Sequence, residues 1–402
     1  MRAAAFLLVA ACAFEPTDPV ALVGDCPWTT STGRQSCGAM PPREAVPEQA
    51  VTWIPGVALN VTSDGAGGAI AASHAMPAVD FTGQMPKLSV AVTGAAQADR
   101  LELGLGDSGL ANAFWFTFDS SQTQRWVTEG DPVAFTIPWS EARVVGAPNR
   151  AAITEVRLVV ADTAKRRRVR VAVDGLGLVP EPPGGLVSFT FDDNHASSLL
   201  AAPILAAHGM TATAYVIVET VDQPGSLALV DLHALHEQGW EIAAHAYSGE
   251  NHTAMFPNLD AVTLEDDLVD SRDWLIRNGF TGQDHCAYPH GMFSGGRRGT
   301  DVLAVVGRYF STCRTIYQDE REAWPPSDPL KLRVLYVTAG TTLEAARAAV
   351  DRAVASRDWL ILVFHRLTPG TPRSTTEWNV DDFAALVDHA AGSGLALKTI
   401  GR

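Results

Sequence analysis

The stretch that decides the fold reads LVSFTFDD and runs from Leu186 to Asp193. An apolar strand pattern here ends in two adjacent carboxylates. Successive side chains of a strand point to opposite faces, so Asp192 and Asp193 can serve one site only where the chain is already bending away. Two charges this close repel unless a cation lies between them or one takes up a proton. The pair therefore predicts either metal-assisted proton transfer or an Asx turn that caps the next helix.

Strand-like and helical stretches alternate in the rest of the chain. Thr341-Thr342-Leu343-Glu344 has the pattern of a capping box before a helix at 345–355, and Asn379 with Asp382 plays a similar part for the last helix. Continuous apolar strands separated by helices predict a parallel sheet, here long enough to close as a (β/α) barrel over 184–402. The predicted strands are 186–191, 211–217, 240–244, 285–288, 310–315, 332–337, 359–364 and 395–400.

Residues 51–180 show short alternating strands without a convincing amphipathic helix, which predicts an all-β sandwich or jelly roll. The last part resembles the closing strands of carbohydrate-binding jelly rolls. Trp115 is either a sugar-stacking platform or a ring half covered by a neighbouring loop. A hinge-like linker, Pro180–Gly185, follows. The predicted strands are Lys87–Thr93, Arg100–Gly106, Phe114–Phe118, Val133–Pro138, Thr154–Val160 and Val169–Val173.

The first fifty residues predict export. Arg2 precedes an apolar stretch that is too short to span a bilayer, which indicates a signal peptide at 1–11. The run ending in Cys12 resembles the bacterial lipoprotein cleavage box, in which Cys12 becomes the lipidated N-terminus. An ordinary secretory signal, or a start codon assigned at the wrong place, is the alternative. Residues 12–50 predict a flexible tether. We expect an exported protein, either an envelope lipoprotein or secreted, whose only membrane contact is the lipid anchor.

Five cysteines support export, because with Cys12 acylated the other four can pair. Cys26 and Cys37 are close in sequence. Cys286 and Cys313 lie in strand-like runs that a parallel sheet can bring into range, although sequence does not determine the connectivity. No Cys-x-x-Cys spacing occurs, which argues against a zinc–thiolate site.

Composition and motifs limit the classes of protein to which this chain can belong. A chain of 402 residues predicts two domains, and 47% hydrophobic with 19% charged residues indicates a globular protein. The net charge of −15 argues against a nucleic-acid partner. The one basic run, Lys165–Arg168, is interpreted as a solvated turn between strands. A serine hydrolase is a third possibility, but the chain has no Gly-x-Ser-x-Gly elbow, and the lack of a His-Glu-x-x-His motif argues against a zincin protease.

Three further predicted strands end in chemically suggestive residues. His245 ends one strand and His252 follows in a polar loop, so with one Asp they make the three-ligand set of a catalytic zinc site. The segment Cys286–Gly291 frees backbone N–H groups that could face an oxyanion. A buried strand from Trp359 ends in His365. Each of these residues has a purely structural interpretation when taken alone. Together with Asp192 and Asp193 they make four such strand ends at one edge of a barrel, which favours a functional site.

From about 185 to 402 the chain resembles the polysaccharide deacetylases with a NodB-homology domain, the family 4 carbohydrate esterases. Thr190–Asp193 matches the first motif of that family, His245 with His252 the second, Ala287–Gly291 the third and Leu360–His365 the last. The resemblance implies a distorted (β/α) barrel. It also implies a metal-dependent hydrolase that removes N-acetyl or O-acetyl groups from a polysaccharide, here one expected to contain N-acetylglucosamine.

The resemblance implies a role for each residue. Asp193, His245 and His252 would hold a divalent ion, with Zn²⁺ the expected one. Asp192 would take a proton from the attacking water, and His365 would protonate the departing amine. A backbone N–H near His290 would stabilise the oxyanion, so Tyr288 and His290 are the candidate oxyanion or substrate residues.

The chain departs from the family pattern in three ways. Six residues separate the two histidines instead of three, so the loop must bulge for His252 to reach the metal. Ala287 stands where many members carry Arg, and His290 stands where members with a similar third motif carry Tyr. The alternative function is a catalytically inactive carbohydrate-binding surface lipoprotein. If His252 cannot reach, the substitutes are Glu250, Asn251 or His195.

Overall fold

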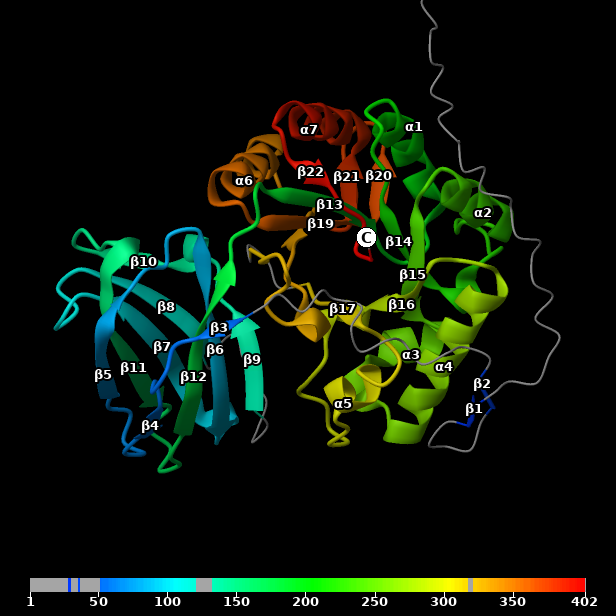
Figure 1. The fold of residues 1–402 in the computed structure, drawn as a ribbon. Helices are drawn as coiled ribbons and strands as arrows, with labels where there is room; N and C mark the ends of the chain where they lie inside the picture. The colour runs from blue at the N-terminus through cyan, green and yellow to red at the C-terminus, as the bar shows by residue number, and fades with distance from the viewer. Residues whose placement is uncertain (1–27, 30–34, 37–50, 121–131, 317–320, 402) are drawn as a thin grey trace, which may run out of the picture.

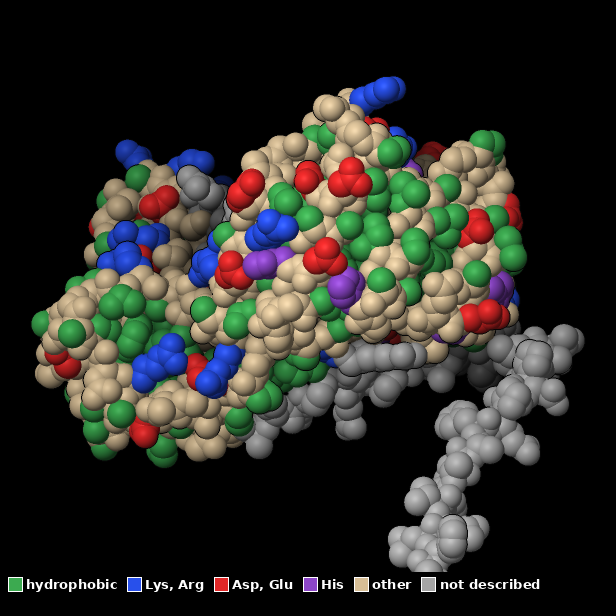
Figure 2. Space-filling model, turned by 90° about the horizontal axis from the view of Figure 1, so that it is seen from above, with side chains coloured by type: hydrophobic (Ala, Val, Ile, Leu, Met, Phe, Trp, Pro, Cys, Tyr) green, Lys and Arg blue, Asp and Glu red, His purple; other side chains and the backbone are tan. Residues whose placement is uncertain are grey.

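The computed structural model describes residues 28–29, 35–36, 51–120, 132–316 and 321–401. An antiparallel half built from residues 51–180 lies beside a parallel half that begins at β13 (Leu186–Phe191), as Figure 1 shows. A short antiparallel ribbon pairs β1 (Trp28–Thr29) with β2 (Gln35–Ser36). Acidic, basic and histidine side chains are interspersed over the face seen in Figure 2.

The antiparallel half consists of two sheets that enclose a common apolar core. Alternate residues of the strands point into that core, as in Leu88, Val90 and Val92, which are fully buried. In order across the first sheet the strands are β10 (Arg143–Val145), β8 (Ala113–Ser120), β7 (Ala98–Gly106), β11 (Ile153–Asp162) and β5 (Ile70–Val79). The second has β3 (Thr52–Trp53), β12 (Arg170–Pro180), β6 (Gln84–Thr93) and β9 (Pro132–Thr136), with β4 (Leu59–Thr62) also paired to β12.

The predicted sandwich is confirmed, and each predicted strand corresponds to an observed one. The sequence did not reveal β3, β4, β5 or β10; β5 is an edge strand with mostly exposed side chains, so it lacks the apolar alternation that marks a strand. Trp115 is half-buried, with its ring against Gly104 and the Arg143 guanidinium 5.8 Å from the ring centroid. The ring is thus partly covered, but by the neighbouring strands β7 and β10 and not by the loop that was expected. The basic run 165–168 is exposed between β11 and β12, as predicted.

The parallel half is a curled sheet. An isolated parallel bridge between Arg314 and Leu332 joins β17 to the segment that leads into β18, so the curl closes as a distorted barrel. The predicted barrel is therefore confirmed, although several strands are shorter than expected. In order around the sheet they are β17 (Thr312–Arg314), β16 (Gly282–Ala287), β15 (Glu241–Ala246), β14 (Thr213–Ile217), β13, β19 (Trp359–Phe364) and β18 (Leu335–Tyr336), with β22 (Ala396–Leu397) also paired to β13.

Helices cover the outside of this sheet; in Figure 1, α6 and α7 lie beyond β13 and β19. Asn379 caps α7 as predicted, accepting from the backbone N–H groups of Asp381 and Asp382. The predicted capping box begins one residue too early, because Thr342 and not Thr341 caps α6. The helices are α1 (Ala201–Ala206), α2 (Leu229–Glu237), α3 (Gly249–Ala254), α4 (Ala261–Arg277), α5 (Val302–Val306), α6 (Leu343–Ser356) and α7 (Val380–Gly392). Two short strands, β20 (Arg366–Thr368) and β21 (Glu377–Asn379), pair near the start of α7.

The barrel strands are buried on both faces, which explains their continuous apolar runs. One face packs against the helices. The other forms an inner cluster with Tyr215, Ala287, Ile361 and Val363. Because parallel strands end at a common edge, the residues that continue this inner face at the carboxyl ends converge at one mouth of the barrel.

Cys286 and Cys313 form a disulfide between β16 and β17, as predicted. Cys12, Cys26 and Cys37 lie outside the described residues, as do the predicted signal at 1–11 and most of the predicted tether. Within the described part of the chain, no helix is long and apolar enough to cross a membrane.

A buried arginine connects the two halves. Arg333, 1% exposed, contacts Glu141 of the sandwich and lies 3.4 Å from Glu322 Oε1. Its Nη2 also donates to Ser327 Oγ at 3.0 Å. Nearby, Ser140 Oγ donates to Asp358 Oδ1 at 3.0 Å. Polar contacts around Arg333 and between Ser140 and Asp358 thus connect the two halves.

We expect Arg333→Ala to lower the free energy of unfolding by about 3–5 kcal/mol, because it leaves two carboxylates without their buried cation. Denaturant unfolding measures this. Arg357→Ala is the control: Arg357 is half exposed and 3.8 Å from Glu181, so its loss should cost no more than about 0.5 kcal/mol. Equal effects of the two substitutions would contradict the importance of the network.

Candidate metal centre

The chain turns sharply where β13 ends. Asp193 and Asn194 both adopt left-handed backbone conformations, with φ of 65° and 57°. Asp and Asn tolerate this region better than other residues with a side chain. The turn brings the Asp193 carboxylate to the same mouth as Asp192, as the chemical interpretation of the pair requires. The capping alternative is not supported, since the next short helix is capped at His195 without a side-chain hydrogen bond.

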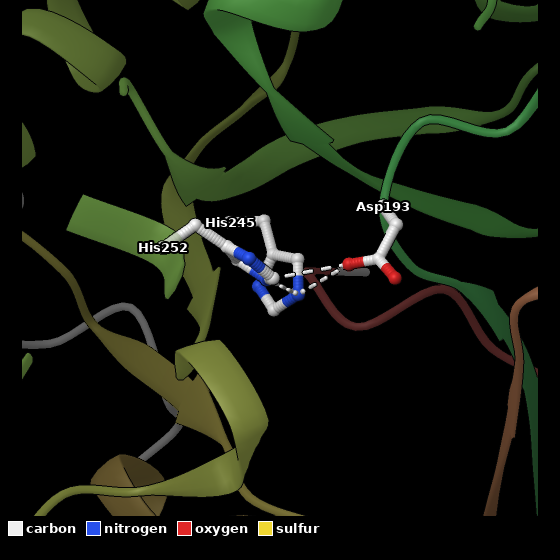
Figure 3. Close-up of side chains that lie close together, drawn as sticks. All are labelled: Asp193, His245 and His252. Carbon is white, nitrogen blue, oxygen red and sulfur yellow. Dashed lines mark hydrogen bonds and ion pairs between the residues drawn. The ribbon is translucent and has the colours of Figure 1, made fainter. Parts of the chain in front are cut away.

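Three ligand atoms meet at this mouth. Asp193 Oδ1 lies 3.4 Å from His245 Nε2 and 3.3 Å from His252 Nε2, and the two nitrogens are 3.2 Å apart. Figure 3 shows the three side chains pointing toward one another. Ligands held about 2.0–2.2 Å from a tetrahedral ion are separated by about 3.4 Å, so the triangle matches one metal ion. Among the described residues, these three form the one group identified as able to hold an ion.

His245 is held in the orientation that a ligand needs. It ends the inner face of β15 and is 3% exposed. Its Nδ1 lies 2.9 Å from the carbonyl oxygen of Ala287, which fixes the tautomer with the proton on Nδ1 and leaves the Nε2 lone pair for a metal. Burial lowers the pKa of His245, but the nearby Asp193 and Asp192 carboxylates outweigh it and raise the pKa above its usual value.

His252 reaches the triangle by a route that the sequence did not predict. The loop does not bulge; it forms the short helix α3, whose first turn is capped by Ser248. Asp267 of α4 accepts hydrogen bonds from the backbone N–H groups of Tyr247 and Ser248 and from Asn251 Nδ2. These contacts fix the start of α3 and place His252 beside His245.

The substitutes considered for His252 are not needed. Glu250 is exposed, and Asn251 is bonded to Asp267. His195 does come close, with Nε2 3.6 Å from Asp193 Oδ2. Burial raises the pKa of Asp193, but hydrogen bonds from His195, His245 and His252 outweigh it and hold the pKa well below its usual range.

Asp192 and His365 lie next to the triangle. His365 Nε2 is 4.0 Å from Asp192 Oδ2 and 3.7 Å from Asp193 Oδ2. Burial raises the pKa of Asp192, but the charge of Arg314 leads the opposing interactions and holds the pKa below its usual value. Burial lowers the pKa of His365 below its usual value, although the nearby carboxylates of Asp192 and Asp193 act to raise it. The site therefore holds an ionised carboxylate and an imidazole side by side.

The two residues predicted from the third motif, Tyr288 and His290, differ in whether they are available to the site. The Tyr288 hydroxyl donates to Leu330 O at 2.9 Å and its N–H to Arg314 O at 3.0 Å, so neither group is left for the predicted oxyanion or substrate contact. His290 is exposed, with φ of 53°, and its ring centroid is 5.1 Å from that of His252. A Cβ on Gly291 would lie 2.3 Å from Ile316 Cγ1, so this turn requires glycine.

Two supporting residues, Asp267 and Arg314, were not predicted from the sequence. Asp267 lies within a helix, where a carboxylate normally faces solvent, and no sequence signal distinguishes it. Arg314 contacts Asp192 from β17. A charged residue inside the apolar run 310–315 was the signal that could have revealed it.

We expect the wild-type protein to bind one divalent ion and His252→Ala to weaken binding by more than the roughly 10–100-fold that loss of an outer partner costs. Titration calorimetry and metal analysis measure this. Glu250→Ala, on the same helix but exposed, should bind as wild type. Wild-type affinity in His252→Ala would exclude this ligand set.

Comparison with known proteins assigns part of the chain to a family. The family model described as Polysaccharide deacetylase matches residues 180–299. No curated protein matches the chain.

Similar solved structures include a family 4 acetyl xylan esterase from Clostridium thermocellum in complex with a cobalt ion (16% identity, 53% of this chain and 87% of that chain, TM-score 0.36). Another is the peptidoglycan deacetylase PdaC from Bacillus subtilis (14% identity, 55% of this chain and 89% of that chain, TM-score 0.35). A third is a polysaccharide deacetylase from Bacillus cereus (12% identity, 79% of this chain and 99% of that chain, TM-score 0.33). The family model alone assigns the domain. Residues 180–299 are a polysaccharide deacetylase domain, preceded in the chain by antiparallel β-sheets.

Proposed function

We propose that this chain is a metal-dependent deacetylase that removes N-acetyl, or alternatively O-acetyl, groups from a polysaccharide. The observation that carries the proposal is the ligand triangle of Asp193, His245 and His252 with Asp192 and His365 beside it. A metal site, a carboxylate base and an imidazole acid are the parts that hydrolysis of an acetamide needs.

The residues present fit a divalent ion, and we propose zinc. Two imidazole nitrogens and one carboxylate oxygen form a common catalytic zinc set, which leaves a coordination position open. The hydrogen bond from His245 Nδ1 to Ala287 supplies the outer support that such sites use. When bound, the ion would polarise the acetyl carbonyl and make water easier to deprotonate.

Asp192 is the proposed base. Its Oδ1 is occupied by Arg314, while Oδ2 is on the side of His365. Its low pKa keeps it ionised, so it can accept a proton from the water that attacks the acetyl carbon.

His365 is the proposed acid. Its Nε2 lies near both carboxylates, on the opposite side of the ring from the buried Nδ1. In this proposal Asp192 passes the proton taken from water to His365, whose Nε2 lies 4.0 Å from Asp192 Oδ2. The carbon–nitrogen bond then breaks as the sugar nitrogen takes that proton from Nε2, which yields acetate and a free amine. We further propose that the backbone at His290 helps to hold the oxyanion.

We propose that the substrate is a surface or exported glycan that contains N-acetylglucosamine. The sequence features of residues 1–12 support export, with Cys12 as the lipid anchor, and residues 51–180 are proposed to bind carbohydrate. The rival function, an inactive glycan-binding lipoprotein, rested on the long spacing between the two histidines. That support weakens because α3 carries His252 to the triangle.

We expect the wild type to release acetate from at least one of chitin oligomers, poly-N-acetylglucosamine, peptidoglycan and acetylxylan, and to lose this activity on chelation. Asp192→Asn should lower kcat about 10²–10⁴-fold and retain the metal, because it removes the base but no ligand. Asp388→Asn, at an exposed carboxylate of α7, is the control. No release by the metal-loaded wild type from any of the four would refute the proposed activity.

A further inference from the structure

The proposed base has a buried cationic partner. Arg314 is fully buried and Asp192 is 2% exposed, and Arg314 Nη2 donates to Asp192 Oδ1. Arg314 Nη1 donates to the carbonyl of Thr315 at 2.9 Å, and the guanidinium carbon lies 4.8 Å from the centroid of the Tyr215 ring. These contacts hold the planar guanidinium in one orientation. A buried arginine and a buried aspartate each need the other as counter-charge.

The position of Arg314 in the sheet is informative. In the parallel ladder between β16 and β17, the residue paired with Arg314 is Ala287. Ala287 is the position where many members of the resembled family carry arginine. Paired residues on neighbouring strands point to the same face, and the strands are about 4.8 Å apart. An arginine side chain is long enough to cover that distance, and the methyl group of Ala287 leaves room for it.

The alignment of the two strands is fixed covalently. Cys286 and Cys313, which directly precede the Ala287–Arg314 pair, are joined by a disulfide. The N–H of Tyr288 donates to Arg314 O at 3.0 Å on the other side of the pair. The disulfide before the pair and this hydrogen bond after it therefore keep Arg314 beside Ala287.

We propose that Arg314 is the positioning residue for Asp192 and supplies, from the neighbouring strand, the cation that is missing at Ala287. By binding Oδ1 it fixes the rotation of the carboxylate, and Oδ2 is left toward the mouth, 4.0 Å from His365 Nε2. The inference rests on the proposed function, in which Asp192 accepts the proton from water.

The test uses the full-length, metal-loaded protein with the best acetylated substrate. Arg314→Gln and Arg314→Ala should each lower kcat about 100-fold, the scale on which misplacing a reacting group acts, with KM and metal content close to wild type. Guanidinium ion added to Arg314→Ala should restore part of the lost rate. The double variant Ala287→Arg/Arg314→Ala should also recover activity, because it returns the cation to the paired position.

Arg272→Gln is the matched control, since Arg272 is a buried arginine of α4 whose ion-pair partner, 2.9 Å away, is Asp284 of β16 and not Asp192. It should destabilise the fold without changing kcat. A rate loss in the Arg314 variants that neither guanidinium nor the transplanted arginine reverses would overturn the proposal, as would no loss at all.

A second readout needs neither metal nor turnover. Thermal melting of metal-free Asp192→Asn, Arg314→Gln and the double variant forms a double-mutant cycle. We expect the double variant to melt well above the temperature predicted by adding the two single effects. Additive effects would overturn the pairing. If the wild type released no acetate, the proposed function would fail, while this cycle would still decide whether Arg314 fixes Asp192.

Discussion

The site depends on one constraint: a single carboxylate, that of Asp193, must meet two imidazoles from another part of the barrel within about the edge length of a tetrahedron. The left-handed turn after β13 supplies the carboxylate, and the end of β15 supplies His245. The short helix α3 supplies His252, and its start is held by Asp267. No one of these elements forms the site by itself, and their convergence at the carboxyl edge of the parallel sheet creates the candidate metal site.

The sequence predicted the features of the structure that hydrophobic periodicity and strand ends reveal. Continuous apolar runs between helices correctly indicated the barrel, because strands buried on both faces have no other pattern. The strand ends at Asp193 and His245 correctly located the mouth. The disulfide between Cys286 and Cys313 was foreseen because both lie in strands that could be neighbours. Edge strands such as β5 were missed because exposure removes the apolar alternation.

What the sequence did not reveal depends on three-dimensional proximity. The distance between His245 and His252 along the chain suggested a bulge, whereas a turn of helix takes up the extra residues. Tyr288 was expected at the site, yet its hydroxyl and N–H are bonded elsewhere. The cation beside Asp192 comes from β17, and only the strand register brings Arg314 and Ala287 together.

The most direct measurement of the central claim is anomalous diffraction from crystals of the zinc-loaded protein. The ligand triangle predicts one strong peak about 2.0–2.2 Å from Asp193 Oδ1, His245 Nε2 and His252 Nε2. A peak bound elsewhere, or one whose coordination omits His252, would contradict it.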